Sequence, residues 1–231
     1  MDLSGTLSVI FKKEFSAKKI SHLHDCLLDE NKGNFHLQSS HKFIGYLYVS
    51  HSKGIIRIHL KLKKCMFIGG SKNGHKDGTF DKVLFNQPFG MTLLNEHTLL
   101  VCDSGNRMIR SIDFEQGIVS TLCGHVQQQT RSLDGDFSKS TFHCPKKISS
   151  IPSLGVLFVT DSQSLVNSAP GKIRIVDMNI SKIFTFVDQE LQSPQGIVAR
   201  VARHDNSQNV NLFIADSVLN CIAHFVLQVA N

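Results

Sequence analysis

A sequence block recurs along this chain at a spacing of just under sixty residues. The segment DGTFDKVLFNQPFG begins at Asp77, and the segment DGDFSKSTFHCPKK begins 57 residues later at Asp134. Both read Asp-Gly-x-Phe, followed by a second Phe and then by a Pro. A third copy keeps only its end, LQSPQG, with Leu191, Pro194 and Gly196. Repetition on this scale indicates similar units that stack on one another.

Each block is followed by an apolar run that ends in an acid and a serine. The runs LLVCDS, LFVTDS and LFIADS end around Asp103, Asp161 and Asp216, and a fainter run, LYVSHS, has His51 in the place of the acid. An arginine follows on the next apolar segment in three units, which aligns Arg110, Arg174 and Arg57. The segments are five to seven residues long, rich in Val, Ile, Leu and Phe, and separated by Gly, Asp, Ser and Asn, as is typical of short strands.

Four short strands per unit, repeated at this period, predict the blades of a β-propeller. No segment keeps the i, i+3, i+4, i+7 pattern of a helix for three turns, which disfavours helical repeats. The sequence therefore predicts an all-β fold in which the apolar faces of neighbouring sheets pack on each other.

The best-formed unit, residues 77–124, resembles the repeat of the NHL family of β-propellers. The family pattern is F-x-x-P-x-G, an apolar strand ending in V-x-D, then N-x-x-I-R and V-x-T-x-x-G. The residues that match it are Phe85, Pro88, Gly90, Val101, Asp103, Asn106, Ile109, Arg110, Val119, Thr121 and Gly124. Residues 134–188 and 191–228 match in part, and residues 11–70 match weakly. The resemblance implies an interaction scaffold, with RNA binding or lyase and hydrolase activity in some relatives.

We expect one domain over residues 1–231, with about four four-stranded blades. The expected blades are residues 11–70, 77–124, 134–188 and 191–228. The last unit contains only three apolar segments, whereas SGTLSVI at residues 4–10 has the composition of a fourth strand. Two arrangements stay open: residues 4–10 close a four-bladed ring, or the chain is an incomplete arc of a larger propeller.

The recurring polar residues are interpreted as structural. A short Asp at the end of a strand accepts hydrogen bonds from the N–H groups of the following turn, Asn tolerates the left-handed conformation, and Arg pairs with a nearby acid or carbonyl. A catalytic set should occur once, whereas this set returns in several units. The residues so assigned are Asp103, Asn106, Arg110, Asp161, Arg174 and Asp216, with Asn220 as the asparagine that accompanies Asp216.

Two other groups of residues contain side chains that can bind a metal ion or act as a nucleophile. The cluster HLHDC contains His22, His24, Asp25 and Cys26, but no second ligand pair follows at a spacing typical of zinc. His143 and Cys144 are adjacent, which does not supply the geometry of a nucleophile and its base. The chain has no phosphate-binding loop and no G-x-S-x-G motif. We therefore predict a non-enzyme with no catalytic residue, bound metal or cofactor.

The uneven charge fits lysines that keep exposed strand faces soluble, and it also fits a nucleic acid or an acidic protein partner. Residues 1–75 carry 12 Lys and Arg against 5 Asp and Glu, a local charge of +7, whereas the rest carries 13 against 14. In a meander of four strands, the turns between second and third strands and the connections between blades emerge on one face, where binding usually occurs. The candidate binding residues on this face are Lys53, Arg107, Arg131, Lys146 and Lys147. A protein partner is favoured, with RNA as the alternative, although the chain has no Trp for base stacking.

The sequence also predicts a cytoplasmic protein that does not bind membranes. It contains no run of about 18 apolar residues and no basic, then apolar, leader. Its six cysteines include no C-x-x-C pair, which favours free thiols in a reducing compartment. The sequence sets no expectation for the oligomeric state.

Overall fold

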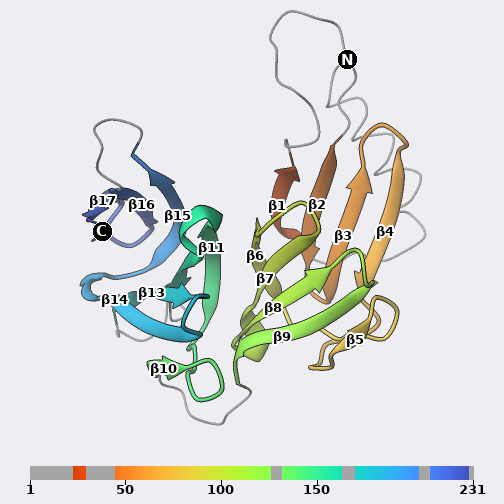
Figure 1. Ribbon diagram of the computed structural model, residues 1–231, viewed down its shortest axis with the longest axis horizontal. Helices are drawn as coiled ribbons and strands as arrows, with labels where there is room; N and C mark the ends of the chain where they lie inside the picture. The colour runs from red at the N-terminus through yellow and green to blue at the C-terminus, as the bar shows by residue number, and fades with distance from the viewer. Residues whose placement is uncertain (1–22, 30–44, 126–131, 163–169, 203–208, 229–231) are drawn as a thin grey trace, which may run out of the picture.

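The protein is represented by a computed structural model that describes residues 23–29, 45–125, 132–162, 170–202 and 209–228. In these residues the chain forms four antiparallel sheets that follow one another in sequence order (Figure 1). The described helices are two three-residue 3-10 turns, Ser104–Asn106 and Pro152–Leu154, and neither could cross a membrane. The predicted all-β, four-bladed architecture is confirmed.

The strands of the first sheet are β1 (Leu23–Asp29), β2 (Tyr46–His51), β3 (Gly54–His59) and β4 (Lys64–Gly69). The second contains β5 (Gly78–Thr79), β6 (Pro88–Leu93), β7 (Thr98–Asp103), β8 (Met108–Asp113) and β9 (Ile118–Gly124). The third contains β10 (Gly135–Asp136), β11 (Pro145–Ile151), β12 (Val156–Asp161), β13 (Gly171–Asp177) and β14 (Lys182–Leu191). The fourth contains β15 (Pro194–Val201), β16 (Val210–Asp216) and β17 (Cys221–Leu227).

Each sheet is a meander, with one addition in the middle two. The second sheet has the order β5-β9-β8-β7-β6 and the third the order β10-β14-β13-β12-β11. In each, a two-residue strand that begins at the glycine of Asp-Gly pairs with the outermost long strand. Strand β14 runs to Leu191, three residues beyond the expected end of that blade. The closing strand expected at residues 4–10 lies outside the described residues.

The inner strands of the four sheets are β1, β6, β11 and β15, and they pack on one another. β1 contacts β6, β6 contacts β11, and β11 contacts β15, whereas no contact of this extent joins β15 to β1 among the described residues. Pro88, Pro145 and Pro194 begin the inner strands of the second, third and fourth sheets. Proline is tolerated as the first residue of an edge strand, where its missing N–H breaks no ladder.

The core lies between consecutive sheets. Tyr48 and Ile55 of the first sheet pack with Val101 and Ile112 of the second, and comparable clusters fill the spaces between the second and third and between the third and fourth sheets. Because side chains alternate along a strand, each middle sheet contributes to two clusters. The opposite face of the first sheet carries a fourth buried cluster of Val49, Ile56, Ile58 and Leu60.

Candidate functional site

A buried ionic network holds the second sheet together. The Arg110 side chain on β8 has no exposed surface; its Nη1 donates to Asp103 Oδ2 at 2.9 Å and its Nη2 to Asp77 Oδ1 at 2.5 Å. The same guanidinium donates to two backbone carbonyls of the loop that precedes β6. Asp77, at the Asp-Gly turn, also accepts hydrogen bonds from the N–H and hydroxyl of Thr121 on β9. Arg110 thus joins the end of β7, the entering loop and the outer strand.

Asp103 also binds the segment of chain that leads into β6. Its Oδ1 accepts the backbone N–H of Asn86 at 2.8 Å, two residues before Pro88, and its Oδ2 accepts the side-chain amide of Asn106 at 2.8 Å. Burial raises the pKa of Asp103, against the lowering effects of these hydrogen bonds and of Arg110. The carboxylate therefore fixes the connection that leads into the inner strand.

The third sheet repeats this network at the equivalent residues. Arg174, also without exposed side-chain surface, contacts Asp161 Oδ2 at 3.2 Å and Asp134 Oδ1 at 2.8 Å. Asp134 accepts the N–H and hydroxyl of Thr185. Partial burial would raise the pKa of Asp134, but the Thr185 hydrogen bonds and Arg174 outweigh it and lower the pKa. Asp161 accepts the N–H groups of the two residues before Pro145.

The fourth sheet keeps the acid and lacks the arginine. Asp216 accepts backbone N–H groups at 2.7 to 3.0 Å from Gln192 and Ser193, just before Pro194, and from Val218 and Leu219 in the following turn. Burial opposes ionisation, yet the four N–H groups together lower the pKa of Asp216.

The strand register identifies the residue that replaces the arginine. Arg110 lies two residues after Met108, the strand partner of Asp103, whereas two residues after Cys221, the partner of Asp216, the chain has Ala223. Asn220 directly precedes Cys221 with φ of 52°, so it matches Arg107, with φ of 61°, and the expected match to Asn106 is wrong.

The alignment of Arg57 with the buried arginines is also wrong. His51 pairs with Gly54, so the residue two positions later is Ile56, which is buried. Arg57 lies one residue further and points to the opposite face, because side chains alternate along a strand. Its guanidinium carbon is 3.7 Å from the ring centroid of Tyr46 and 4.0 Å from that of Phe114, an arrangement that stabilises a cation between the first two sheets.

The thiols near the motif are poor nucleophiles. Burial raises the pKa of Cys102 on β7, and also that of Cys123 and Cys144. A thiol that stays protonated at neutral pH does not attack an electrophile readily. His143 and Cys144 both use their backbone N–H groups to bind Asp161.

The HLHDC cluster is divided between different contacts. His22 lies outside the described residues; the His24 ring stacks on Phe89 with centroids 4.3 Å apart, and its Nδ1 is 2.8 Å from the Pro88 carbonyl oxygen. Asp25 pairs with Lys147 Nζ at 2.5 Å. In the part of the chain that the structure describes, no three His, Cys, Asp or Glu residues are grouped so as to hold a metal ion.

The candidate cationic residues gather at one end of the sheets, which we call the loop end. Lys53 lies in the β2–β3 turn and Arg107 in the β7–β8 turn. The N–H of Gln87, before β6, donates to the Ser52 carbonyl at 2.9 Å, and the Ser104 hydroxyl donates to the carbonyl of Pro145, the first residue of β11. Contacts between sheets therefore bring these turns together.

Two of the lysines lie in a strand rather than in a loop. Lys146 and Lys147 are the second and third residues of β11, at the loop end of the inner strand. Lys146 Nζ is 4.2 Å from the Phe89 ring centroid, whereas Lys147 pairs with Asp25. The local sequence pattern does not indicate Phe89 or Asp25 as their neighbours, because Asp25 lies 122 residues from Lys147. Arg131 lies outside the described residues.

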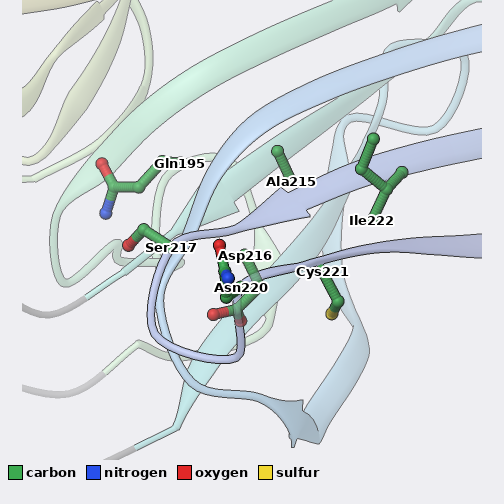
Figure 2. Close-up of a pocket in the computed structure, with 7 residues that line it drawn as sticks. All are labelled: Gln195, Ala215, Asp216, Ser217, Asn220, Cys221 and Ile222. Carbon is green, nitrogen blue, oxygen red and sulfur yellow. The ribbon is translucent and has the colours of Figure 1, made fainter.

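A pocket of about 320 Å³ opens on the fourth sheet near the β16–β17 turn (Figure 2). Its lining residues are Gln195, Ala215, Asp216, Ser217, Asn220, Cys221 and Ile222. Ala215 and Ile222 are cross-strand partners and lie on the same side of the sheet. No expected site residue other than Asp216 and Asn220 contributes to this pocket.

Comparison with known sequences gives partial matches. No family model matches the chain. The human protein named NHL repeat-containing protein 2 is 44% identical over 68 residues, which are 29% of this chain and 9% of that protein. The chicken protein of the same name is 44% identical over 57 residues, or 25% of this chain and 8% of its own. The match thus spans less than a tenth of the length of these relatives.

Solved structures match over most of the chain at low identity. A Bacteroides thetaiotaomicron protein of unknown function has a TM-score of 0.57 and 16% identity, covering 79% of this chain and 44% of its own. A calcium-binding protein, regucalcin from Agrobacterium tumefaciens, has a TM-score of 0.52 and 10% identity, covering 80% and 51%. Each match extends over about half of a larger propeller. The chain is thus a distant, partial homologue of NHL repeat-containing protein 2, and its four sheets are blades of an NHL-type β-propeller.

Proposed function

We propose that this propeller is a non-catalytic scaffold that binds an acidic protein surface at its loop end. The observation that carries the proposal is the position of Lys53, Arg107 and Lys146, which come from three consecutive blades and lie at the same end. Loops and strand ends on a rigid scaffold are the usual binding positions in such folds. Cations from several blades could meet carboxylates of one partner at once.

The absence of a catalytic role is proposed from what the polar residues already do. Asp103, Arg110, Asp161 and Arg174 use their charges within the two buried networks. These side chains are also buried, so a substrate in solution does not reach them. The loop-end cations are different, because Lys53 and Lys146 are partly exposed.

The test compares two charge reversals in quantitative interaction mass spectrometry with the whole protein as bait. In one variant Lys53 and Lys146 are changed to Glu; in the control Lys61 and Lys64, which are exposed at the β3–β4 turn, are changed to Glu. We expect acidic proteins that bind the wild type to be lost only from the loop-end variant. Equal binding by both variants would refute the proposal.

RNA is the second candidate, because the same cations would attract a polyanion. The measurement that separates the two is the binding of a single-stranded RNA as a function of salt. Each phosphate contact adds about −0.7 to the slope of log K against log salt. A slope steeper than about −2 that the loop-end variant flattens would assign this end to RNA.

A further inference from the structure

The fourth sheet exposes an apolar face. Val198 on β15, Phe213 on β16 and Ile222 and Val226 on β17 are 47%, 42%, 73% and 54% exposed. Val198 pairs with Phe213 and Ala215 with Ile222, which places these side chains on one face. We call this surface the outer face of the fourth sheet, and the other face packs against the third sheet through Leu212 and Ile214.

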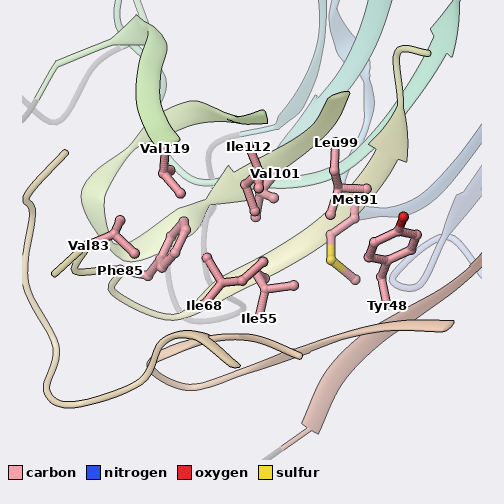
Figure 3. Close-up of a cluster of buried hydrophobic side chains, with 10 residues drawn as sticks. All are labelled: Tyr48, Ile55, Ile68, Val83, Phe85, Met91, Leu99, Val101, Ile112 and Val119. Carbon is pink, nitrogen blue, oxygen red and sulfur yellow. The ribbon is translucent and has the colours of Figure 1, made fainter. Parts of the chain in front are cut away.

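The same positions are buried in the other three sheets. Three residues before the recurring acid or its histidine replacement, the first three sheets have Tyr48, Leu100 and Phe158, which are at most 2% exposed, and the fourth has Phe213. The residue that pairs with the acid or histidine is followed by Ile55, Ile109 and Ile173 in the first three sheets, and none of these has exposed surface. In the fourth sheet the residue at this position is Ile222. Figure 3 shows how Tyr48 and Ile55 are covered by the second sheet.

Gly196 lies at the inner edge of the outer face of the fourth sheet, and among the described residues it has room beside it for the backbone of a neighbouring strand. A Cβ added to Gly90, two residues after Pro88, would be 2.5 Å from the Lys146 carbonyl oxygen and 2.7 Å from the Lys147 Cα, so β6 needs glycine there to approach β11. Gly196 is two residues after Pro194, and among the described residues a Cβ there would meet only Ala215, at 3.3 Å. No described residue fills beside Gly196 the space that β11 occupies beside Gly90.

The pocket of Figure 2 lies at the corresponding end of the interface. Ser104, directly after Asp103, donates its hydroxyl to the carbonyl of Pro145 at the start of β11. Ser217, directly after Asp216, lines the pocket together with Gln195. The pocket is therefore where the proline-led start of a next inner strand would lie.

We propose that the outer face of the fourth sheet docks a β-sheet of a partner chain whose inner strand begins with proline. The proposal continues the series of blade interfaces that the structure contains. The matching face of a second copy is the outer face of the first sheet, where Val49, Ile56 and Ile58 are already buried. Residues 1–22 contain no proline, unlike every described inner strand that packs on a preceding sheet. The partner strand carries apolar side chains toward Phe213 and Ile222, because an unpaired charge there would be desolvated at a cost.

The probe is a synthetic peptide of residues 141–151, TFHCPKKISSI, with Ser in place of Cys144, because this segment contains the start of the inner strand that follows the second sheet. The readout is the rate at which a maleimide labels the thiol that Val198→Cys introduces on the outer face, located by peptide mapping, because the equivalent Thr92 contacts Ser150 of the next inner strand. At a peptide concentration ten times the dissociation constant we expect labelling to slow about tenfold, as free sites fall to about one in eleven. A peptide with Pro145 changed to Gly should protect this thiol less.

Three further variants of the whole protein make the result decisive. Phe213→Glu should abolish the protection, while the matched control Ile180→Glu, at a residue 55% exposed in the β13–β14 turn, should keep it. Labelling unaffected by the peptide at millimolar concentration would overturn the proposal. A dimer that Phe213→Glu dissociates in sedimentation would assign the face to a second copy. Faster labelling of the same thiol when Leu7 and Val9 are also changed to Glu would assign the face to the protein's own N-terminal segment.

Discussion

The second and fourth sheets contain the same acid in different surroundings. Asp103 is enclosed with Arg110, and neither side chain has exposed surface. Asp216 is held by four backbone N–H groups, with Ala223 at the arginine position. The task that both acids share is to bind N–H groups just before the proline of the inner strand. We infer that this hydrogen bonding is the basic requirement of the repeat.

The arginine occurs where a second acid exists to receive it. Arg110 and Arg174 each reach the aspartate of an Asp-Gly turn, Asp77 and Asp134, and this turn is missing before the fourth sheet. A buried guanidinium without enough acceptors would be strongly destabilising. The buried arginine and the aspartate of the Asp-Gly turn therefore occur together. We expect replacement of the recurring acid to destabilise the second and fourth sheets to different extents.

The largest effect is expected for Asp103→Ala. It leaves Arg110 buried with only Asp77 and carbonyls as partners, and breaking a buried pair from one side costs about 3–5 kcal/mol of the free energy of unfolding. Urea denaturation followed by circular dichroism measures the loss. Asp188→Ala, which removes a half-exposed partner of Lys172, is the control and should change stability by less than about 0.5 kcal/mol. Similar losses in both variants would contradict the role assigned to the network.

A glycine pair tests the same contrast at the interfaces. Gly90→Ala forces a Cβ onto the backbone of β11 and should cost about 1–3 kcal/mol by overpacking. Gly196→Ala has only Ala215 nearby among the described residues and should stay within about 0.5 kcal/mol. Thermal melts of the two variants are the measurement, and a larger loss at Gly196 would show that the fourth sheet is already covered on that side.

Asp216→Ala should destabilise less than Asp103→Ala. Its N–H partners lose a charged acceptor, but no buried cation is orphaned, and we expect a loss of about 1–2 kcal/mol. Hydrogen exchange should show the change at the amides of Gln192 and Ser193 in particular. Uniform acceleration of exchange over all four sheets would be inconsistent with a local role.

Lowering the pH should change the contributions of Asp216 and Asp103 to folding stability in opposite directions. The pKa of Asp216 is lowered on folding, so the stability it contributes is complete above the unfolded value of about 3.9 and is lost as pH falls through the folded pKa. The pKa of Asp103 is raised, so its contribution is complete below the unfolded pKa and lost as pH rises through the folded one. In denaturation midpoints between about pH 5 and pH 2, Asp216→Asn should flatten the acid decline, whereas Asp103→Asn should steepen it.

The smallest effect is expected for Lys147→Met. Its ion pair with Asp25 joins the third and first inner strands, but the two side chains are 31% and 17% exposed. Pairs with access to solvent contribute about 0–1 kcal/mol. A double-mutant cycle with Asp25→Asn measures the coupling, and a value above about 2 kcal/mol would reveal a much stronger link across the inner strands.

The sequence predicted the repeat, the strand content and the recurring acids, because these depend on local pattern. It misplaced Arg57 since a shift of one residue in a strand moves a side chain to the opposite face. It also missed the partners of the arginines and of Lys147, because Asp77, Asp134 and Asp25 are brought near by the stacking of sheets. Lys146 and Lys147 were expected in the connection between blades, whereas the strand already begins at Pro145, and they are its second and third residues.

The hydrogen bonds that each acid accepts from the preceding connection span short stretches of chain. Asp103 reaches back 17 residues to Asn86, Asp161 reaches back 17 to Cys144, and Asp216 reaches back 23 to Ser193. During synthesis, the entry to each inner strand can therefore be secured soon after its own second strand leaves the ribosome, without waiting for the later sheets. Such local closure favours rapid, stepwise folding from the N-terminal end.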